Sequence, residues 1–189
     1  METLLVASRK GLYVVRGEGT RWAIEAHHFA GEPVSQVLAD PRDGAWYAAL
    51  RMGHFGVKLR KSTDMGATWK EVGAPAFPQK PTQGPMAEDP TPWNVDLIWA
   101  LTPGGAAEPG VLWAGCMPAG LFRSEDGGQT WALNTPLWED PRRLGWFGGG
   151  IVDANPAPAP LSKPLAKAQN AAYIPCQPFT RAPDEPAFC

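Results

Sequence analysis

The sequence predicts an all-β repeat fold built from small antiparallel sheets, and two observations carry that prediction. The chain has nine tryptophans against three tyrosines, with 21 glycines and 21 prolines among its 189 residues. This composition is typical of β folds with many turns and a repeated aromatic packing position, and it argues against a helical bundle. An eight-residue pattern, Ser-x-Asp-x-Gly-x-Thr-Trp, also occurs twice, at 62–69 and at 124–131. Two copies in one short chain indicate a repeated structural unit.

Strand-forming segments surround the first copy of this octapeptide. Residues 34–38 are a short apolar run, and 40–44 (Asp-Pro-Arg-Asp-Gly) have turn chemistry. Residues 45–50 predict a second strand, 57–61 an alternating third strand, and 68–72 a fourth strand after the octapeptide. Four consecutive antiparallel strands correspond to one blade of a β-propeller.

The second copy repeats this order, and the N-terminus contains part of it. Strands are expected at 95–101, 111–116, 120–123 and 130–134, with a turn at Pro103-Gly104-Gly105. Near the N-terminus, 4–8 and 11–16 resemble second and third strands, and 19–22 resembles a degenerate turn, but an innermost strand is missing. We therefore expect an incomplete propeller over 1–150, made of a partial blade (1–29) and two blades (34–72 and 95–134).

Each octapeptide residue type has a structural purpose in a tight turn. Aspartate accepts backbone N–H bonds, serine ties the strand end to the turn, and glycine permits positive φ. The tryptophan buries a flat surface against the adjoining sheet. We expect these structural residues to be Ser62, Asp64, Gly66, Thr68 and Trp69, and Ser124, Asp126, Gly128, Thr130 and Trp131.

The octapeptides resemble the Asp-box, or bacterial neuraminidase repeat (BNR), of β-propellers in the sialidase-like superfamily. Similar proteins include sialidases, sortilin-type receptor domains and photosystem II assembly factors. The resemblance implies a scaffold over 1–150 and is weak for activity. A sialidase site, as the family has it, needs three arginines, a Tyr/Glu nucleophile pair and an acid/base Asp. Its first arginine lies in Phe/Tyr-Arg-Ile-Pro, and Phe122-Arg123-Ser124 lacks the Ile-Pro, so the catalytic residues stay unassigned.

Two groups of residues are candidates for a binding site on the rim of the propeller. Arg51, His54 and Phe55 occupy the bend between the second and third strands of the first complete blade. The second group consists of Glu88, Asp89, Trp93 and Asp96, in or beside a proline-rich insertion at 73–92. Rim loops are where propellers carry function, while turn structure and a solvated loop are the competing interpretations.

No metal or cofactor is expected. His27 and His28 would point to opposite faces of a strand, and no third ligand with suitable spacing is visible. The three cysteines, Cys116, Cys176 and Cys189, have no metal-ligand spacing, and we expect Cys116 to face the same rim as the Arg51 bend.

The net charge, the N-terminal apolar run and the cysteine count lead to expectations about partners and location. The net charge of −2 gives no reason to propose nucleic acid or an anionic membrane as a partner. Residues 4–7 are too short an apolar run for a signal peptide or a membrane span, and the odd cysteine count argues against a disulfide framework, so we expect a cytoplasmic protein.

The Pro/Ala-rich tail, 151–189, is expected to be irregular, and the sequence resembles a truncated family member. A closed propeller needs at least about four blades, which at this spacing exceeds 189 residues. We therefore expect a ring that does not close from this chain alone and unpaired blade edges that promote association. The expected function is a non-catalytic module binding a protein or carbohydrate through its rim loops, and the alternative is a sialidase-like glycoside hydrolase.

Overall fold

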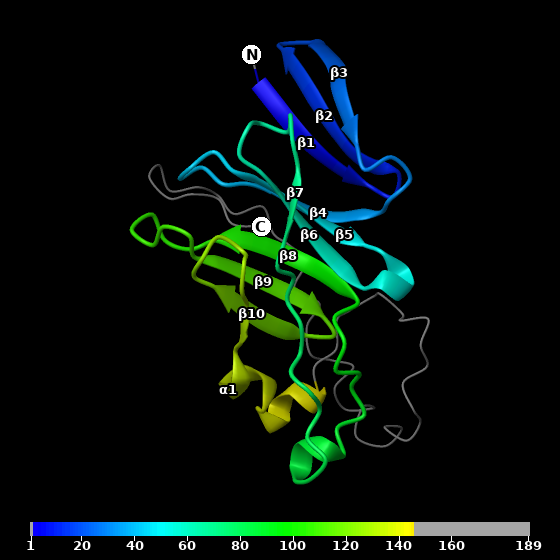
Figure 1. Ribbon diagram of the computed structural model, residues 1–189, viewed down its shortest axis with the longest axis vertical. Coiled ribbons are helices and arrows are strands. Elements are labelled where there is room, and N and C mark those ends of the chain that lie inside the picture. The colour runs from blue at the N-terminus through cyan, green and yellow to red at the C-terminus, as the bar shows by residue number, and fades with distance from the viewer. Residues whose placement is uncertain (1, 146–189) are drawn as a thin grey trace, which may run out of the picture. The chain divides into compact units, whose positions relative to one another are not determined.

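The computed structural model describes residues 2–145, and the secondary structure in that range is almost entirely β (Figure 1). Its strands form three antiparallel sheets, which confirms the predicted all-β class. Short helices connect or follow the sheets: the α-helix α1 (Thr135–Trp138) and the 3-10 helices η1 (Gly53–Phe55), η2 (Pro85–Ala87) and η3 (Pro141–Gly145). The predicted tail at 151–189 lies outside the described residues.

The first sheet contains β1 (Glu2–Ser8), β2 (Gly11–Glu18) and β3 (Arg21–His28), in that order. β1 pairs with β2 along its whole length, from Glu2 opposite Gly17 to Ser8 opposite Gly11. Among the described residues, no strand pairs with the other edge of β1.

The second and third sheets each have four strands joined in sequence order, which is the arrangement of a propeller blade. The second sheet contains β4 (Val34–Ala39), β5 (Trp46–Arg51), β6 (Val57–Ser62) and β7 (Lys70–Val72). The third contains β8 (Leu97–Pro103), β9 (Leu112–Met117), β10 (Gly120–Ser124) and β11 (Ala132–Leu133).

Several strand boundaries differ from the sequence expectation. Pro103, expected in a turn, is the last residue of β8 and lies opposite Leu112; proline is tolerated there because the pairing ends at that residue. The fourth strands begin later than expected, because Thr68 and Thr130 bond back to the aspartates of their own turns.

The two octapeptide turns have the same hydrogen bonds. Ser62 Oγ donates to Asp64 Oδ1 at 2.7 Å and accepts from the Gly66 N–H at 2.8 Å. Asp64 also accepts from the backbone N–H of Thr68 at 2.8 Å and from its hydroxyl at 2.6 Å. Ser124, Asp126, Gly128 and Thr130 repeat all four contacts in the second turn. Both aspartates therefore use their acceptor oxygens within their own turns.

Each octapeptide tryptophan is half-buried against the preceding sheet. Trp69, which follows β6, packs beside Phe29 with ring centroids 5.2 Å apart. Trp131 donates its indole N–H to the carbonyl of Gly73, which follows β7, at 2.9 Å. The core lies mainly between the second and third sheets, where Leu59, Leu112 and Phe122 are fully buried.

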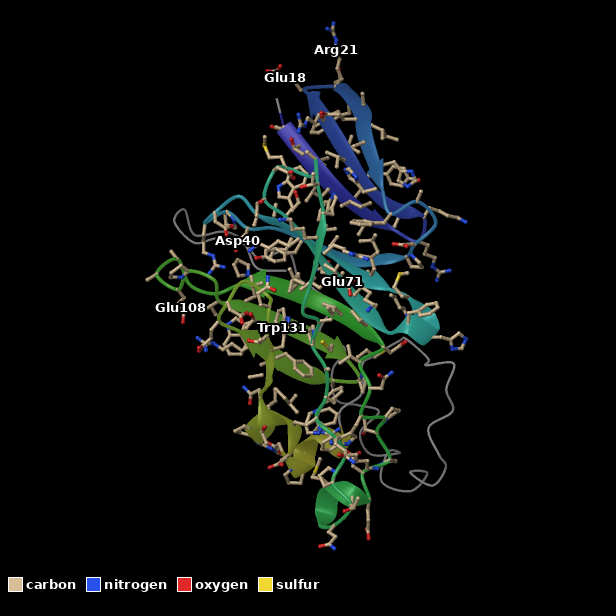
Figure 2. All side chains as sticks on the ribbon, in the orientation of Figure 1. Glu18, Arg21, Asp40, Glu71, Glu108 and Trp131 are labelled. Carbon is tan, nitrogen blue, oxygen red and sulfur yellow. The ribbon has the colours of Figure 1, made fainter. Side chains whose placement is uncertain are left out.

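Polar side chains also join the second sheet to the third. Arg42, in the loop after β4, forms an ion pair with Asp40 and donates to the carbonyls of Glu108 at 2.7 Å and Val111 at 2.8 Å. Asp40 and Glu108 lie at the same end of these two sheets (Figure 2). Tyr47, which is 1% exposed, donates its hydroxyl to the Gly127 carbonyl at 3.2 Å. The Arg42 bonds hold the connection between β8 and β9 against the second sheet, and the Tyr47 bond does the same for the second octapeptide turn.

The proline-rich insertion connects the second sheet to the third and contributes to the core of the third sheet. Phe77 contacts Phe122 edge to face at 5.2 Å and Trp138 at 4.4 Å between ring centroids. No helix within residues 2–145 has the length and apolar character needed to cross a lipid bilayer.

Candidate functional site

The candidate site lies at the end of the second sheet that is opposite the octapeptide turn. The strands are antiparallel, with Val34 opposite Leu50 and Arg51 opposite Val57. The start of β4, the end of β5 and the start of β6 therefore share one end of the sheet. The octapeptide begins at Ser62, the last residue of β6, and forms its turn at the other end of the sheet.

Helix η1 shapes this end of the sheet. Gly53 and Gly56 have φ values of 57° and 72°, a region that favours glycine because it has no Cβ. The backbone N–H of Gly56 donates to the Gly53 carbonyl at 3.0 Å, and that of Met52 donates to the Gly56 carbonyl at 2.9 Å. This compact bend carries Phe55, whose side chain is 79% exposed, away from the core.

An open depression of about 590 Å³ lies beside η1. Arg51 and Asp96 form a bidentate ion pair across it, with Nη2–Oδ2 at 2.5 Å and Nε–Oδ1 at 3.2 Å, and both side chains are about half exposed. Asp96 is itself positioned by its backbone N–H, which donates to the Met117 carbonyl at 2.9 Å. The full lining is Gly31, Glu32, Pro33, Arg51, Met52, Gly53, His54, Phe55 and Asp96.

The chemistry of this depression suits binding. Its lining carries two carboxylates, Glu32 and Asp96, against one guanidinium, and the guanidinium is already paired. Met52, Phe55 and Pro33 add apolar surface. An exposed aromatic beside a half-exposed ion pair offers both burial area and directional hydrogen bonds to a partner.

The sequence candidates other than Asp89 fall into three places. Arg51, His54, Phe55 and Asp96 lie together around this depression. Trp93 lines a second, smaller depression of about 200 Å³, together with Gly56 and Phe77. Glu88 is exposed and lines neither depression.

Asp89 is buried, in contrast to the accessible position that we expected for it. It is 3% exposed, forms an ion pair with Arg143, and accepts from the Thr91 backbone N–H at 2.9 Å. Burial favours the neutral acid, but the hydrogen bonds from Thr91 and Arg143 outweigh it and hold the pKa of Asp89 below its ordinary value. Arg143 also lies over the Trp138 ring, 3.8 Å from its centroid. Asp89 therefore has a structural environment.

Cys116 lies near the end of β9, next to Met117, whose carbonyl accepts the bond from Asp96, but its side chain is buried. It is 6% exposed, and burial raises the pKa of its thiol to about 12. The thiolate, which is the nucleophilic form, is therefore scarce at neutral pH.

The histidines of β3 have separate surroundings. His27 stacks on Tyr13 at 4.2 Å between ring centroids, and His28 packs beside Trp69 at 5.8 Å. Burial, followed by the neighbouring His27, lowers the pKa of His28. Within residues 2–145, no group of three or more His, Cys, Asp or Glu side chains is placed to hold a metal ion.

Sequence reasoning missed Glu32, Pro33 and Arg143. Glu32 and Pro33 belong to the connection between β3 and β4. In the sequence, the neighbouring Gly31 was the available sign of a turn there, and in the structure its φ is 85°. Arg143 is separated from Asp89 by 54 positions, and no local pattern links them.

The comparisons with known proteins are sparse. Neither the models of protein families nor the curated proteins give a match to this chain. A solved structure described as "YCF48 bound to D1 peptide" is similar at 15% sequence identity, with a TM-score of 0.42. The similarity covers 68% of this chain and 34% of the other, so the chain spans about a third of that protein's length. A likeness this distant establishes neither a family nor a ligand.

Proposed function

We propose that this chain is a non-catalytic β-propeller module of the Asp-box type that binds a protein partner through the Arg51 depression. The observation that carries the proposal is the exposed Phe55 beside the Arg51–Asp96 ion pair. Both are presented at the end of the second sheet that the octapeptide turn leaves free.

The surface favours a protein segment as the ligand. Phe55 is 79% exposed although it is fixed on a short helix between two positive-φ glycines. An exposed aromatic with little conformational freedom to lose is the type of residue that dominates protein interfaces. The Arg51–Asp96 pair offers both a donor and an acceptor at its exposed edges, which suits the mixed polarity of a peptide backbone.

Hydrolysis of the sialidase type receives less support. Sialidases grip a substrate carboxylate with three arginines, whereas Arg51 is the one arginine among the residues that line the depression. Its guanidinium is already engaged by Asp96. A carboxylate ligand would have to displace that contact.

Selection from a phage-displayed random peptide library tests the proposal. Peptides selected on the full chain should bind the Phe55→Ser variant roughly tenfold or more weakly, because the anchor of the interface is removed. Met65→Ser removes another exposed apolar side chain, on the octapeptide turn and 66% exposed, and should leave binding unchanged. Selected peptides that bind all three proteins equally, or a library without binders, would refute the proposal.

A further inference from the structure

The outward faces of the first and third sheets are apolar, although both face solvent in the described structure. Alternation along β1 and β2 puts Leu5 and Leu12 toward the second sheet and Leu4, Val6 and Val15 on the outer side. Leu4 is 50% exposed, Val6 43%, and Ile24 of the neighbouring β3 64%. An antiparallel sheet that faces water on one side normally has polar residues on that side.

The third sheet shows the same feature on the opposite side of the stack of sheets. Leu112, Ala114 and Phe122 point toward the second sheet and are 0% exposed. The outer side carries, in contrast, half-buried or exposed apolar side chains: Leu97, Trp99, Trp113, Met117 and Leu121. Trp99 is 55% exposed.

The second sheet shows what such faces contact when they are covered. Ala48 and Leu50 of β5 face the first sheet and are 0% exposed, and Tyr47 and Ala49 face the third sheet and are 1% and 0% exposed. In each packed pair, the face of a sheet that points toward the next sheet in the chain contacts the face of that next sheet that points back. In the described structure, the first sheet leaves its backward-pointing face open, and the third sheet leaves its forward-pointing face open.

Trp113 makes this correspondence specific. Tyr47 lies opposite Lys61, whose Nζ is 5.2 Å from the Tyr47 ring centroid, and Lys61 immediately precedes the octapeptide serine. Trp113 lies opposite Arg123, which also precedes an octapeptide serine and lies 5.6 Å from the Trp113 ring centroid. Tyr47 is covered by the third sheet and donates to its turn. Trp113 occupies the same position on a face that none of the described sheets covers.

We propose that two copies of this chain associate head to tail, with the outer face of β1–β3 of one copy packed on the outer face of β8–β11 of the other. The contact would repeat the sheet-on-sheet packing found twice within the chain. A second copy fits because the chain carries both faces of the pair, and the apolar side chains of each match what the second sheet buries. Such a heterologous contact either closes a ring or extends an open chain of copies.

Molar-mass measurements on the full 189-residue protein and three variants test this proposal. The unsubstituted protein should show a mass of at least two copies that falls on dilution. Leu4→Glu and Trp99→Glu should each weaken self-association about tenfold or more, because each places a charge in an apolar contact. Met65→Glu, at an exposed position outside both faces, should associate like the unsubstituted protein.

Mixing the two face variants provides the decisive measurement. Each variant retains one intact face, so an equimolar mixture should form a one-to-one dimer at a protein concentration at which each variant alone is monomeric. Circular dichroism melts of the separate variants establish that they are folded. A monomeric unsubstituted protein, a mixture that stays monomeric, or loss of association in only one of the two variants would overturn the head-to-tail contact.

Discussion

At the scale of single residues, the octapeptide serines have the most demanding hydrogen-bonding positions. Ser62 and Ser124 are 2% and 1% exposed, and each hydroxyl bridges its aspartate and the glycine N–H four residues later. Removing a hydroxyl from such a site leaves a buried N–H without a partner, which costs more than the bond itself contributes.

We therefore predict that Ser62→Ala destabilises the protein by about 1–3 kcal/mol. Thr63→Ala is the matched control, because Thr63 is an exposed neighbour in the same turn. Urea denaturation of the two variants should show a lower midpoint for Ser62→Ala alone. Equal midpoints would mean that water replaces the serine in the turn.

The turn aspartates predict how stability depends on pH. The pKa of Asp64 and of Asp126 falls from 3.8 to about 2, first because the Thr68 and Thr130 hydroxyls donate to them and then through backbone N–H bonds. A folded-state pKa below the unfolded value stabilises the fold above the unfolded pKa, and this contribution disappears as the pH falls through the folded pKa. The expected loss lies between about pH 5 and about pH 2.

The Asp64→Asn/Asp126→Asn double variant should isolate this contribution. Its asparagines cannot titrate, so its urea midpoint should start lower at neutral pH and fall less steeply through the acid range than that of the unsubstituted protein. Parallel pH profiles for the two proteins would assign acid sensitivity to other groups, such as Asp140, whose pKa is also lowered to about 2 by Arg142.

The octapeptides also mark the limit of residue-scale sequence reading. Each turn is local, so residue spacing alone predicts which groups can meet. The environment of Asp89 depends on Arg143, which joins it through packing of the insertion and η3. The sequence placed Asp89 with the exposed candidates because such a distant pairing leaves no periodic signal.

At the scale of elements, the second and third sheets approach so closely at Gly73 that any side chain at this position would clash with the facing backbone. A Cβ added to Gly73 would lie 2.0 Å from the backbone oxygen of Gln129. The Gly73 carbonyl also receives the Trp131 indole N–H, so this glycine fixes how the second octapeptide turn approaches β7.

We predict that Gly73→Ala destabilises the protein by about 1–3 kcal/mol, because one backbone must move away from the other. Gly105→Ala is the control, since its added Cβ would meet only the end of the flexible Glu108 side chain, at 3.3 Å. Thermal melts should show a lower midpoint for Gly73→Ala than for Gly105→Ala. A neutral Gly73→Ala would show that the two segments separate easily.

Strand order was predictable because two copies of one pattern align the flanking segments. The boundaries were less so: the fourth strands begin at Lys70 and Ala132 rather than at the turn threonines. Arg51, His54 and Phe55 could be grouped from the sequence because they lie in one bend, and the structure places them around one depression. Glu32 and Asp96 reach it from connections preceding β4 and β8, and only the packed sheets bring those connections together.

At the scale of the whole molecule, the turns that stabilise the sheets lie apart from the surface that we propose for binding. The first octapeptide turn lies at one end of the second sheet and the Arg51 depression at the other. Substitutions that weaken the turns should therefore reduce stability without changing the residues available for binding. Substitutions in the depression should change binding without reducing stability. This separation allows binding to be tested with folded variants.

The absence of glycoside hydrolysis is the final prediction from this arrangement. Purified protein should release no fluorophore from a fluorogenic sialoside above the rate without protein, because Arg51 is already paired and Asp89 is held in a buried ion pair. Asp96→Asn frees the Arg51 guanidinium while removing one carboxylate, so it should remain equally inactive and serve as a matched control. Turnover by the unsubstituted protein that is lost in Asp96→Asn would instead make Asp96 a catalytic acid and the depression an active site.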